Sequence, residues 1–224
     1  IDRLKVLATP VLILLYWQML AASELISSYL LPSPAAVGRA AIELWHNGIL
    51  TQHITTSLLR VLSGFTISFV LAFFVALLVH CSRIIEQLLS APLTLLRMIP
   101  PLAMTPLLIL WLGIGNATQL SIIILASIFP MFLNCLDGLC RVDPNHKELS
   151  TSLNLHPARY FFYVVLPSAI PSIVTGMRLG FGYSWRALIG AELIAASSGL
   201  GYLIIDAQEM MRTDDVMVGI LAIG

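Results

Sequence analysis

The stretch Glu148-Leu149-Ser150, followed by Asn154 and closed by Val164-Val165-Leu166-Pro167, is a polar and charged interlude between two long apolar runs. The chain has 224 residues, of which 58% are hydrophobic and 11% charged, and its mean hydropathy is +0.91. Soluble domains carry about 25% charged residues and about 45–50% apolar ones, so this composition indicates a membrane protein. In such a chain the polar interlude has to lie outside the bilayer, where water can solvate it.

The apolar runs on either side of the interlude predict an all-α polytopic helical bundle with about six transmembrane helices, because a span needs about 20 mostly apolar residues. The expected spans are 4–22, 54–79, 88–112, 120–139, 160–196 and a last one that starts at 216 and is truncated here. The run 160–196 is too long for one span, which predicts a break near Gly190 or at 197–199. Both ends of the chain are expected to continue, since it starts at Ile1 rather than Met and stops at Gly224 inside an apolar run. We expect one transmembrane domain over 1–224.

Basic residues sort the connections between these spans into two sets. One set carries Arg3, Lys5, Arg83, Arg141, Lys147 and Arg159, and the other carries Arg39, Arg60 and Arg212. The positive-inside rule then places the N-terminus and the segment 141–167 in the cytoplasm. The segment 31–48 is expected on the periplasmic side, as a surface helix that starts at Ser33-Pro34.

The cytoplasmic segment has its own start and stop signals. Asp143-Pro144 favours a helix start, with Asp as the cap and Pro at the first position. Asn154 tolerates the left-handed conformation that ends a helix. A second short helix is expected from Leu155-His156-Pro157. Two short helices joined by a tight turn make a rigid knob that suits a cleft in a partner.

The order and spacing of this segment resemble those of the inner-membrane permeases of binding-protein-dependent ABC importers. That family carries Glu-Ala-Ala, then Gly, then Ile-x-Leu-Pro, and this chain has Leu149 and Ser150 for the alanines and Asn154 for the glycine. Asn is the best substitute for Gly in a left-handed turn. Further stretches resemble the nitrate, sulfonate and taurine branch: 31–34, 57–65, 97–103, 106–115, 191–194 and 199–201.

The resemblance implies a type I ABC importer permease in the bacterial inner membrane, crossing it several times. Its implied partners are two copies of a cytoplasmic ATP-binding subunit, a second copy of itself, a periplasmic or lipid-anchored solute-binding protein and membrane lipid. ATP and Mg²⁺ would bind the ATPase, and no cofactor is expected on this chain. The implied ATPase-coupling residues are Glu148, Leu149, Ser150, Asn154, Leu155, His156, Pro157, Leu166 and Pro167.

The residues themselves support no catalytic or nucleic-acid function. The chain has no P-loop pattern, no clustered metal ligands and no nucleophile–base group, so we expect a transport subunit and not an enzyme. Lys and Arg total 12, as do Asp and Glu, so net charge gives no indication of a nucleic-acid partner.

Four charged residues inside apolar runs are candidates for function: Arg97, Arg178, Arg186 and Glu192. A charge at mid-bilayer costs about 2.5–3.5 kcal/mol unless it is paired or faces water. On one helix Arg186 and Glu192 would lie about 240° apart, and Arg178 about 21 Å from Glu192, so partners must come from elsewhere. We expect Glu192 to pair with an Arg as a structural partner, and a gating role is the alternative. Arg178 and Arg186 lie about 80° apart; either they flank a groove for an anion or, as is favoured for Arg178, the side chain holds the helix bundle together.

The paired prolines Pro100 and Pro101 follow Arg97 and predict a kink in the third span. Either these residues line the pathway or gate, or they form a structural kink in which Arg97 binds carbonyls of a neighbouring helix. Met98 and Trp185 line a constriction or belong to the core. Gly176, Gly180 and Gly182 suit close helix packing or a bend.

The sequence therefore predicts the permease subunit of an ATP-driven importer for a small anionic solute, nitrate-, sulfonate- or taurine-like, working by alternating access. The alternative is a secondary transporter or channel that works alone. Such proteins often show inverted repeats or several intramembrane acids. The chain shows no repeat, and its only acids within apolar runs are Glu192 and, near an end, Asp137. A membrane scaffold without transport would not need the intramembrane arginines.

Overall fold

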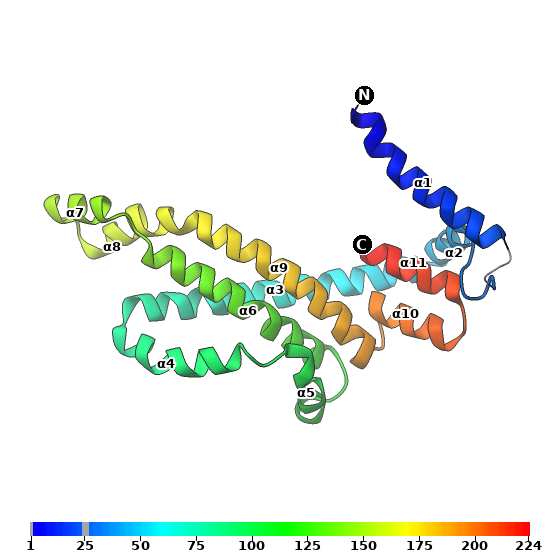
Figure 1. Cartoon of the computed structure of the whole chain (residues 1–224). Helices are drawn as coiled ribbons and strands as arrows, with labels where there is room; N and C mark the ends of the chain where they lie inside the picture. The colour runs from blue at the N-terminus through cyan, green and yellow to red at the C-terminus, as the bar shows by residue number, and fades with distance from the viewer. Residues whose placement is uncertain (1, 24–26) are drawn as a thin grey trace. The chain divides into compact units, whose positions relative to one another are not determined.

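The computed structural model describes residues 2–23 and 27–224, which form helices and connections without a strand (Figure 1). The helices are α1 (Asp2–Ala22), α2 (Pro34–His46), α3 (Ile49–Cys81), α4 (Arg83–Leu96), the 3-10 helix η1 (Pro101–Met104), α5 (Thr105–Leu112), α6 (Asn116–Cys140), α7 (Pro144–Ser152), α8 (Pro157–Tyr160), the π-helix η2 (Phe161–Val165), α9 (Leu166–Ala195), α10 (Leu200–Glu209) and α11 (Thr213–Ile223). The expected all-α fold is confirmed.

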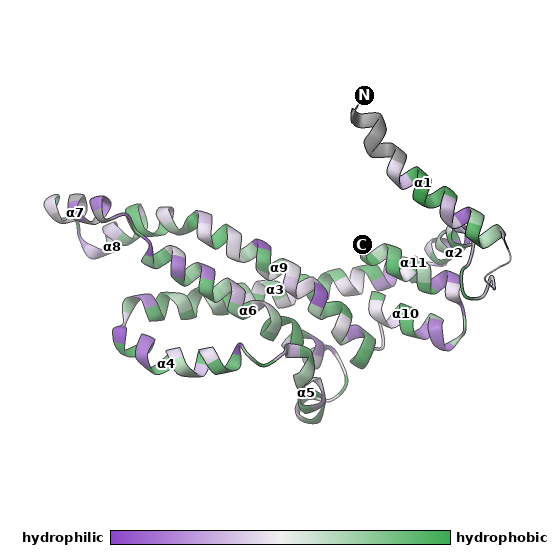
Figure 2. Cartoon of the chain, viewed as in Figure 1, coloured by the Kyte–Doolittle hydropathy of each residue, from purple (hydrophilic) through white to green (hydrophobic). Residues whose placement is uncertain are grey.

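Three helical stretches of the described chain are long and apolar enough to cross a membrane: α3, α6 and 157–209, which contains α9. A bent pair, α4 with 101–112, makes a fourth. The expected first and last spans coincide with α1, whose apolar part is the shorter Thr9–Ala22, and with α11. Figure 2 shows α3 and α5 coloured mainly green, whereas purple and pale residues make up most of α7 and α8. The polytopic membrane fold is therefore confirmed.

The third expected span departs most from the prediction, because the helix is broken and not merely kinked. The two parts of the run 83–112 are bent by 83°. Pro100 and Pro101 lack backbone N–H groups, and each disfavours helical dihedrals in the residue before it, so α4 ends at Leu96 and η1 starts afresh at Pro101. The other expected break, after 160–196, falls at 197–199, while Gly190 lies inside α9.

The described chain divides into two compact units, 1–58 with 192–224 and 59–191. The prediction of a single domain stays a prediction. In the first unit α11 packs against α10 and α2. The buried face of α2 is the stripe Val37, Ala40 and Leu44, and Ser33 caps this helix by accepting a hydrogen bond from the N–H of Ala36 at 3.2 Å. The expected surface helix within 31–48 is therefore confirmed as a helix.

In the second unit, α3, α6 and α9 share one apolar core. Its fully buried members include Ala72 and Ala76 of α3, Met131 and Cys135 of α6 and Ala169 of α9. Small residues bring two of these helices close together, since a Cβ on Gly176 of α9 would lie 2.8 Å from the Cβ of Asn134 on α6. Arg60 lies within α3 and is buried, so the expectation that it belongs to a connection between spans is wrong. Its guanidinium donates to Oδ1 of Asn116 at 2.7 and 3.2 Å.

Candidate functional site

The predicted coupling segment, residues 141–167, contains α7, α8 and η2, and its last two residues begin α9. Oδ1 of Asp143 accepts a hydrogen bond from the N–H of Asn145 at 2.8 Å, just before the body of α7. Asn154 has a φ of 47°, and the N–H of Leu155 donates to the carbonyl of Ser150 at 3.1 Å. The predicted left-handed turn at Asn154 is confirmed. Pro157 begins α8, and Nδ1 of His156 caps it by accepting from the N–H of Ala158 at 3.3 Å.

A π-helix, which the sequence did not predict, joins α8 to α9. The N–H of Leu166 bonds the carbonyl of Phe161, one residue further back than in an α-helix. Pro167 follows directly, and in an α-helix its ring would clash with the carbonyl of residue 163. The π-helix ends two residues before this proline. Pro167, close to the start of the apolar run 160–196, was the available signal.

Most of the expected coupling residues expose their side chains. Glu148, Asn154, His156, Pro157 and Pro167 are exposed, Leu155 and Leu166 are half-buried, and Ser150 is buried. The side chain of Leu149 lies outside the described ones. The two short helices thus present a polar surface on which a partner can dock.

A pocket of about 530 Å³ lies in the second unit, beside the break in the third span. It is bounded by the break, by α6 and by α9. Its lining includes Arg97, Met98, Pro101, Phe129, Leu133, Tyr183 and Arg186. The structure therefore brings together four of the predicted pathway candidates, Arg97, Met98, Pro101 and Arg186, from two separate parts of the sequence.

The two guanidinium groups give this pocket its electrostatic character. None of the described side chains that line it is acidic. Arginine presents a planar fork of donors that matches the oxygens of carboxylate, phosphate and similar oxyanions. A pocket with two such groups and an apolar lining can hold a small anion with an organic part.

The remaining pathway candidates lie elsewhere. Arg178 is exposed and does not line the pocket, so the geometry joins Arg186 to Arg97 instead of the expected Arg178. Trp185 packs against the buried cluster Val61, Ile123 and Leu188. Pro100 immediately precedes η1 and contributes to the break.

Glu192 lies in the first unit, in a network that we call the Glu192 clamp: His53, Ser57, Glu192 and the turn 199–201. The side chain of Glu192 is 1% exposed. The hydroxyl of Ser57 lies 2.9 Å from both carboxylate oxygens, and the N–H of Gly201 donates to Oε2 at 2.9 Å. The carboxylate therefore meets the positive N-terminal end of α10, a favourable place for a negative charge. The expectation of an Arg partner stays a prediction.

The clamp also satisfies the first N–H groups of the turn. The N–H of Leu200 donates to Oγ of Ser57 at 2.9 Å, and the N–H of Gly199 donates to Nδ1 of His53 at 3.0 Å. Sequence reasoning singled out Glu192 and the glycines of the turn but missed His53 and Ser57. The spacing of His53 and Ser57 was the available signal, because residues four positions apart lie on the same face of a helix.

Comparison with known proteins agrees with this geometry. Residues 64–224 match the family described as the inner membrane component of binding-protein-dependent transport systems. The chain belongs to this permease family. It is an inner-membrane transport subunit and not an enzyme, and permeases of this family work with an ATPase and a solute-binding protein. The expected family, fold class, general function and location are thereby confirmed.

Relatives of the permease match over most of their length. The permease is 38% identical over 212 residues to the Escherichia coli SsuC permease protein assigned to aliphatic sulfonates transport, covering 95% of this chain and 81% of the relative. Identity to the Bacillus subtilis protein of the same name is 34% over 218 residues, covering 97% and 79%. Identity to the Escherichia coli taurine transport system permease protein TauC is 32% over 222 residues, covering 97% and 81%.

Proposed function

We propose that this permease forms the transmembrane path for a small sulfonate or a similar anion, and that Arg97 and Arg186 hold the anionic group during passage. The observation that carries the proposal is that both side chains line one pocket at the broken span. The names of the relatives support it, because aliphatic sulfonates and taurine carry a sulfonate group.

The position of the two arginines suits transient binding. An arginine that faces a water-filled cavity keeps contact with water and avoids much of the mid-bilayer cost. The anion replaces that water with charge-assisted hydrogen bonds. Because Arg97 lies at the end of α4 and Arg186 lies on α9, a relative movement of these helices would separate the two groups and release the anion.

The driving force comes from partners. In the proposed cycle a loaded binding protein docks outside and two copies of an ATPase, which bind ATP and Mg²⁺, close below the coupling segment. A second copy of this permease completes the path. The rigid turn at Asn154 keeps α7 and α8 at a fixed angle, so the segment transmits the closure to α9 through η2. Movement of α9 then switches the pocket between the two sides of the membrane.

Uptake measurements on the reconstituted complex test this proposal. Arg97→Gln and Arg186→Gln should each lower ATP-driven uptake of a sulfonate about tenfold or more, because a hydrogen bond to a charged group contributes about 1.5–3 kcal/mol. Arg178→Gln is the matched control, since it removes the same charge from α9 outside the pocket. The control should transport normally.

Three results would overturn the proposal. They are normal uptake in both pocket variants, an equal loss in the control, and uptake that persists without the ATPase. The last result would favour the secondary transporter or channel. Binding of the ATPase to every variant, measured by co-purification, shows that the complex remains assembled.

A further inference from the structure

We call the 530 Å³ pocket beside the broken span the pathway pocket. A second and smaller cavity, of about 190 Å³, lies next to it in the same unit. It runs between α4 and α6, with Val79 of α3 at its side. It shares three residues with the pathway pocket: Arg97, Phe129 and Leu133. The two cavities therefore meet at one of the two guanidinium groups.

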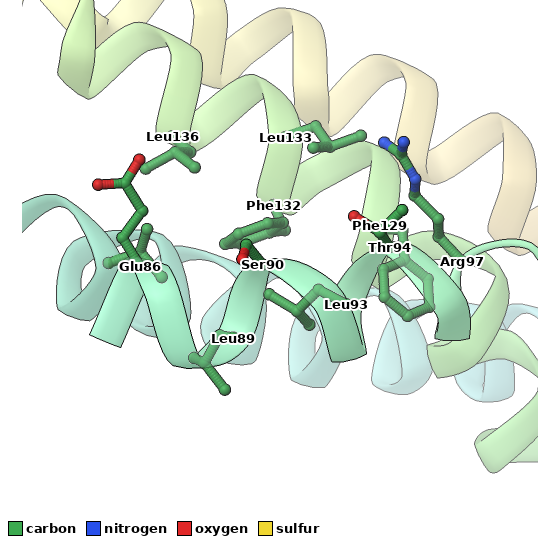
Figure 3. Close-up of a pocket in the computed structure, with 11 residues that line it drawn as sticks. Glu86, Leu89, Ser90, Leu93, Thr94, Arg97, Phe129, Phe132, Leu133 and Leu136 are labelled. Carbon is green, nitrogen blue, oxygen red and sulfur yellow. The ribbon is translucent and has the colours of Figure 1, made fainter. Parts of the chain in front are cut away.

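The lining of this cavity is mostly apolar, with the hydroxyl side chains of Ser90 and Thr94 among the apolar ones and a charged residue at each end. Figure 3 shows Glu86 and Arg97 at opposite ends of a row, with Leu93, Phe132 and Leu133 between them. An engineered apolar cavity of about 150 Å³ binds benzene, so a cavity of this size accepts a short alkyl chain or a single ring. Glu86 and Arg97 lie about 16 Å apart along α4, since an α-helix rises about 1.5 Å per residue.

We propose that this cavity receives the organic group of the transported anion while Arg97 holds its anionic head. The inference rests on the proposed function, because it takes Arg97 as a head-binding residue. It adds that the permease itself, and not only its binding protein, distinguishes anions by the length and polarity of their organic group.

The charges in the cavity favour a short organic anion over a lipid chain. The anionic head is attracted at the Arg97 end and repelled at the Glu86 end, which fixes one orientation and limits the length of the guest. Each methylene that leaves water for the cavity should raise affinity about fourfold until the cavity is full. An inorganic anion such as nitrate gains nothing from this cavity.

A chain-length series tests the proposal. Methanesulfonate, butanesulfonate and octanesulfonate would each be supplied on saturated binding protein to the complete complex in proteoliposomes. Leu93→Trp fills the cavity and should lower uptake of butanesulfonate and octanesulfonate about fivefold or more, with methanesulfonate changed by less than about twofold. Leu95→Trp is the matched control on the same helix, because Leu95 is 67% exposed and does not line the cavity.

A second variant keeps the test decisive if Leu93→Trp fails to assemble with the ATPase. Phe132→Ala enlarges the cavity and should shift the preference of the complex towards octanesulfonate. The binding protein is the same in all measurements, so a change in the ratio between substrates reports on the permease alone.

The outcomes separate this inference from the proposed function. In one outcome, Arg97→Gln abolishes uptake of all three sulfonates while both cavity variants leave the ratios of uptake between the sulfonates unchanged. In that case the proposal that the cavity receives the organic group is wrong, and the proposed anion pathway stands. If Arg97→Gln and Arg186→Gln are both without effect, the proposed function itself fails. An equal loss for all three sulfonates in Leu93→Trp, with an acyl chain found in the cavity, would overturn the inference in favour of lipid.

Discussion

The hydroxyl of Ser57 lies 2.9 Å from both carboxylate oxygens of Glu192, although the two residues are 135 positions apart in the sequence. The same oxygen accepts the N–H of Leu200 at 2.9 Å. One small side chain on α3 thus joins the last turns of α9 to the first turn of α10. A buried carboxylate in so apolar a chain is tolerated because donors surround it.

Ser57→Ala should lower the thermal stability of the permease. It removes the hydroxyl and leaves buried polar groups with fewer partners, which costs about 1–3 kcal/mol. Ser63→Ala is the control on the same helix, since Ser63 is exposed and donates only to the carbonyl of Leu59. Thermal unfolding in detergent should show a lower midpoint for the first variant alone. Equal midpoints would mean that the clamp contributes no net stability.

Gly199→Ala should destabilise the permease more than Gly113→Ala does. Both glycines have backbone conformations almost restricted to Gly, with φ and ψ of 117° and 171° at Gly199 and 76° and 178° at Gly113, and either substitution costs about 1–3 kcal/mol. A Cβ at Gly199 would also overlap the carboxylate of Glu192, whereas nothing lies within 4 Å at Gly113. The difference between their unfolding midpoints measures that overlap. Indistinguishable midpoints would contradict the geometry of the clamp.

Gly176→Ala should separate α9 from α6. The added Cβ would lie 2.8 Å from the Cβ of Asn134 and 3.4 Å from the backbone oxygen of Met131, so the helices have to move apart, at about 1–3 kcal/mol. Gly182→Ala is the matched control on the same helix, with nothing within 4 Å of its Cβ, and should be neutral or slightly stabilising. Thermal unfolding of the two variants checks this, and the reverse order would show that this packing is wrong.

Asn154→Val should weaken assembly with the ATPase, while Asn154→Gly should not. The φ of 47° at Asn154 is unfavourable for a β-branched residue and easily adopted by Gly. Valine would therefore deform the turn between α7 and α8. Co-purification of the ATPase measures the effect, and Leu153→Val, at an exposed neighbour, is the control. Full assembly of the Asn154→Val complex would show that the turn is not needed for docking.

The sequence contained the order of the spans and the turn of the coupling segment, because hydropathy and the conformational preferences of Asn and Pro act locally. The sequence alone did not show which arginines line the same pocket. Arg97 and Arg186 line one pocket beside the point where the chain bends by 83°, and the residues after the bend pack against α6 and α9, of which α9 is distant in sequence. The same limit applies to Ser57 and Glu192, since hydrogen bonds between distant residues have no signature in local periodicity.

In the π-helix Phe161–Val165, the number of residues matters independently of which side chains they carry. The extra residue in this turn rotates everything before it by about 100° relative to an uninterrupted helix. In the proposed coupling, the face that α7 and α8 offer to the ATPase is therefore fixed by the number of residues between α8 and α9. In a homologue that is one residue shorter in this segment, α7 and α8 would present a different face to the ATPase, even if the remaining side chains of the coupling segment were the same. Insertions and deletions here, more than substitutions, should separate permeases that can exchange ATPase subunits from those that cannot.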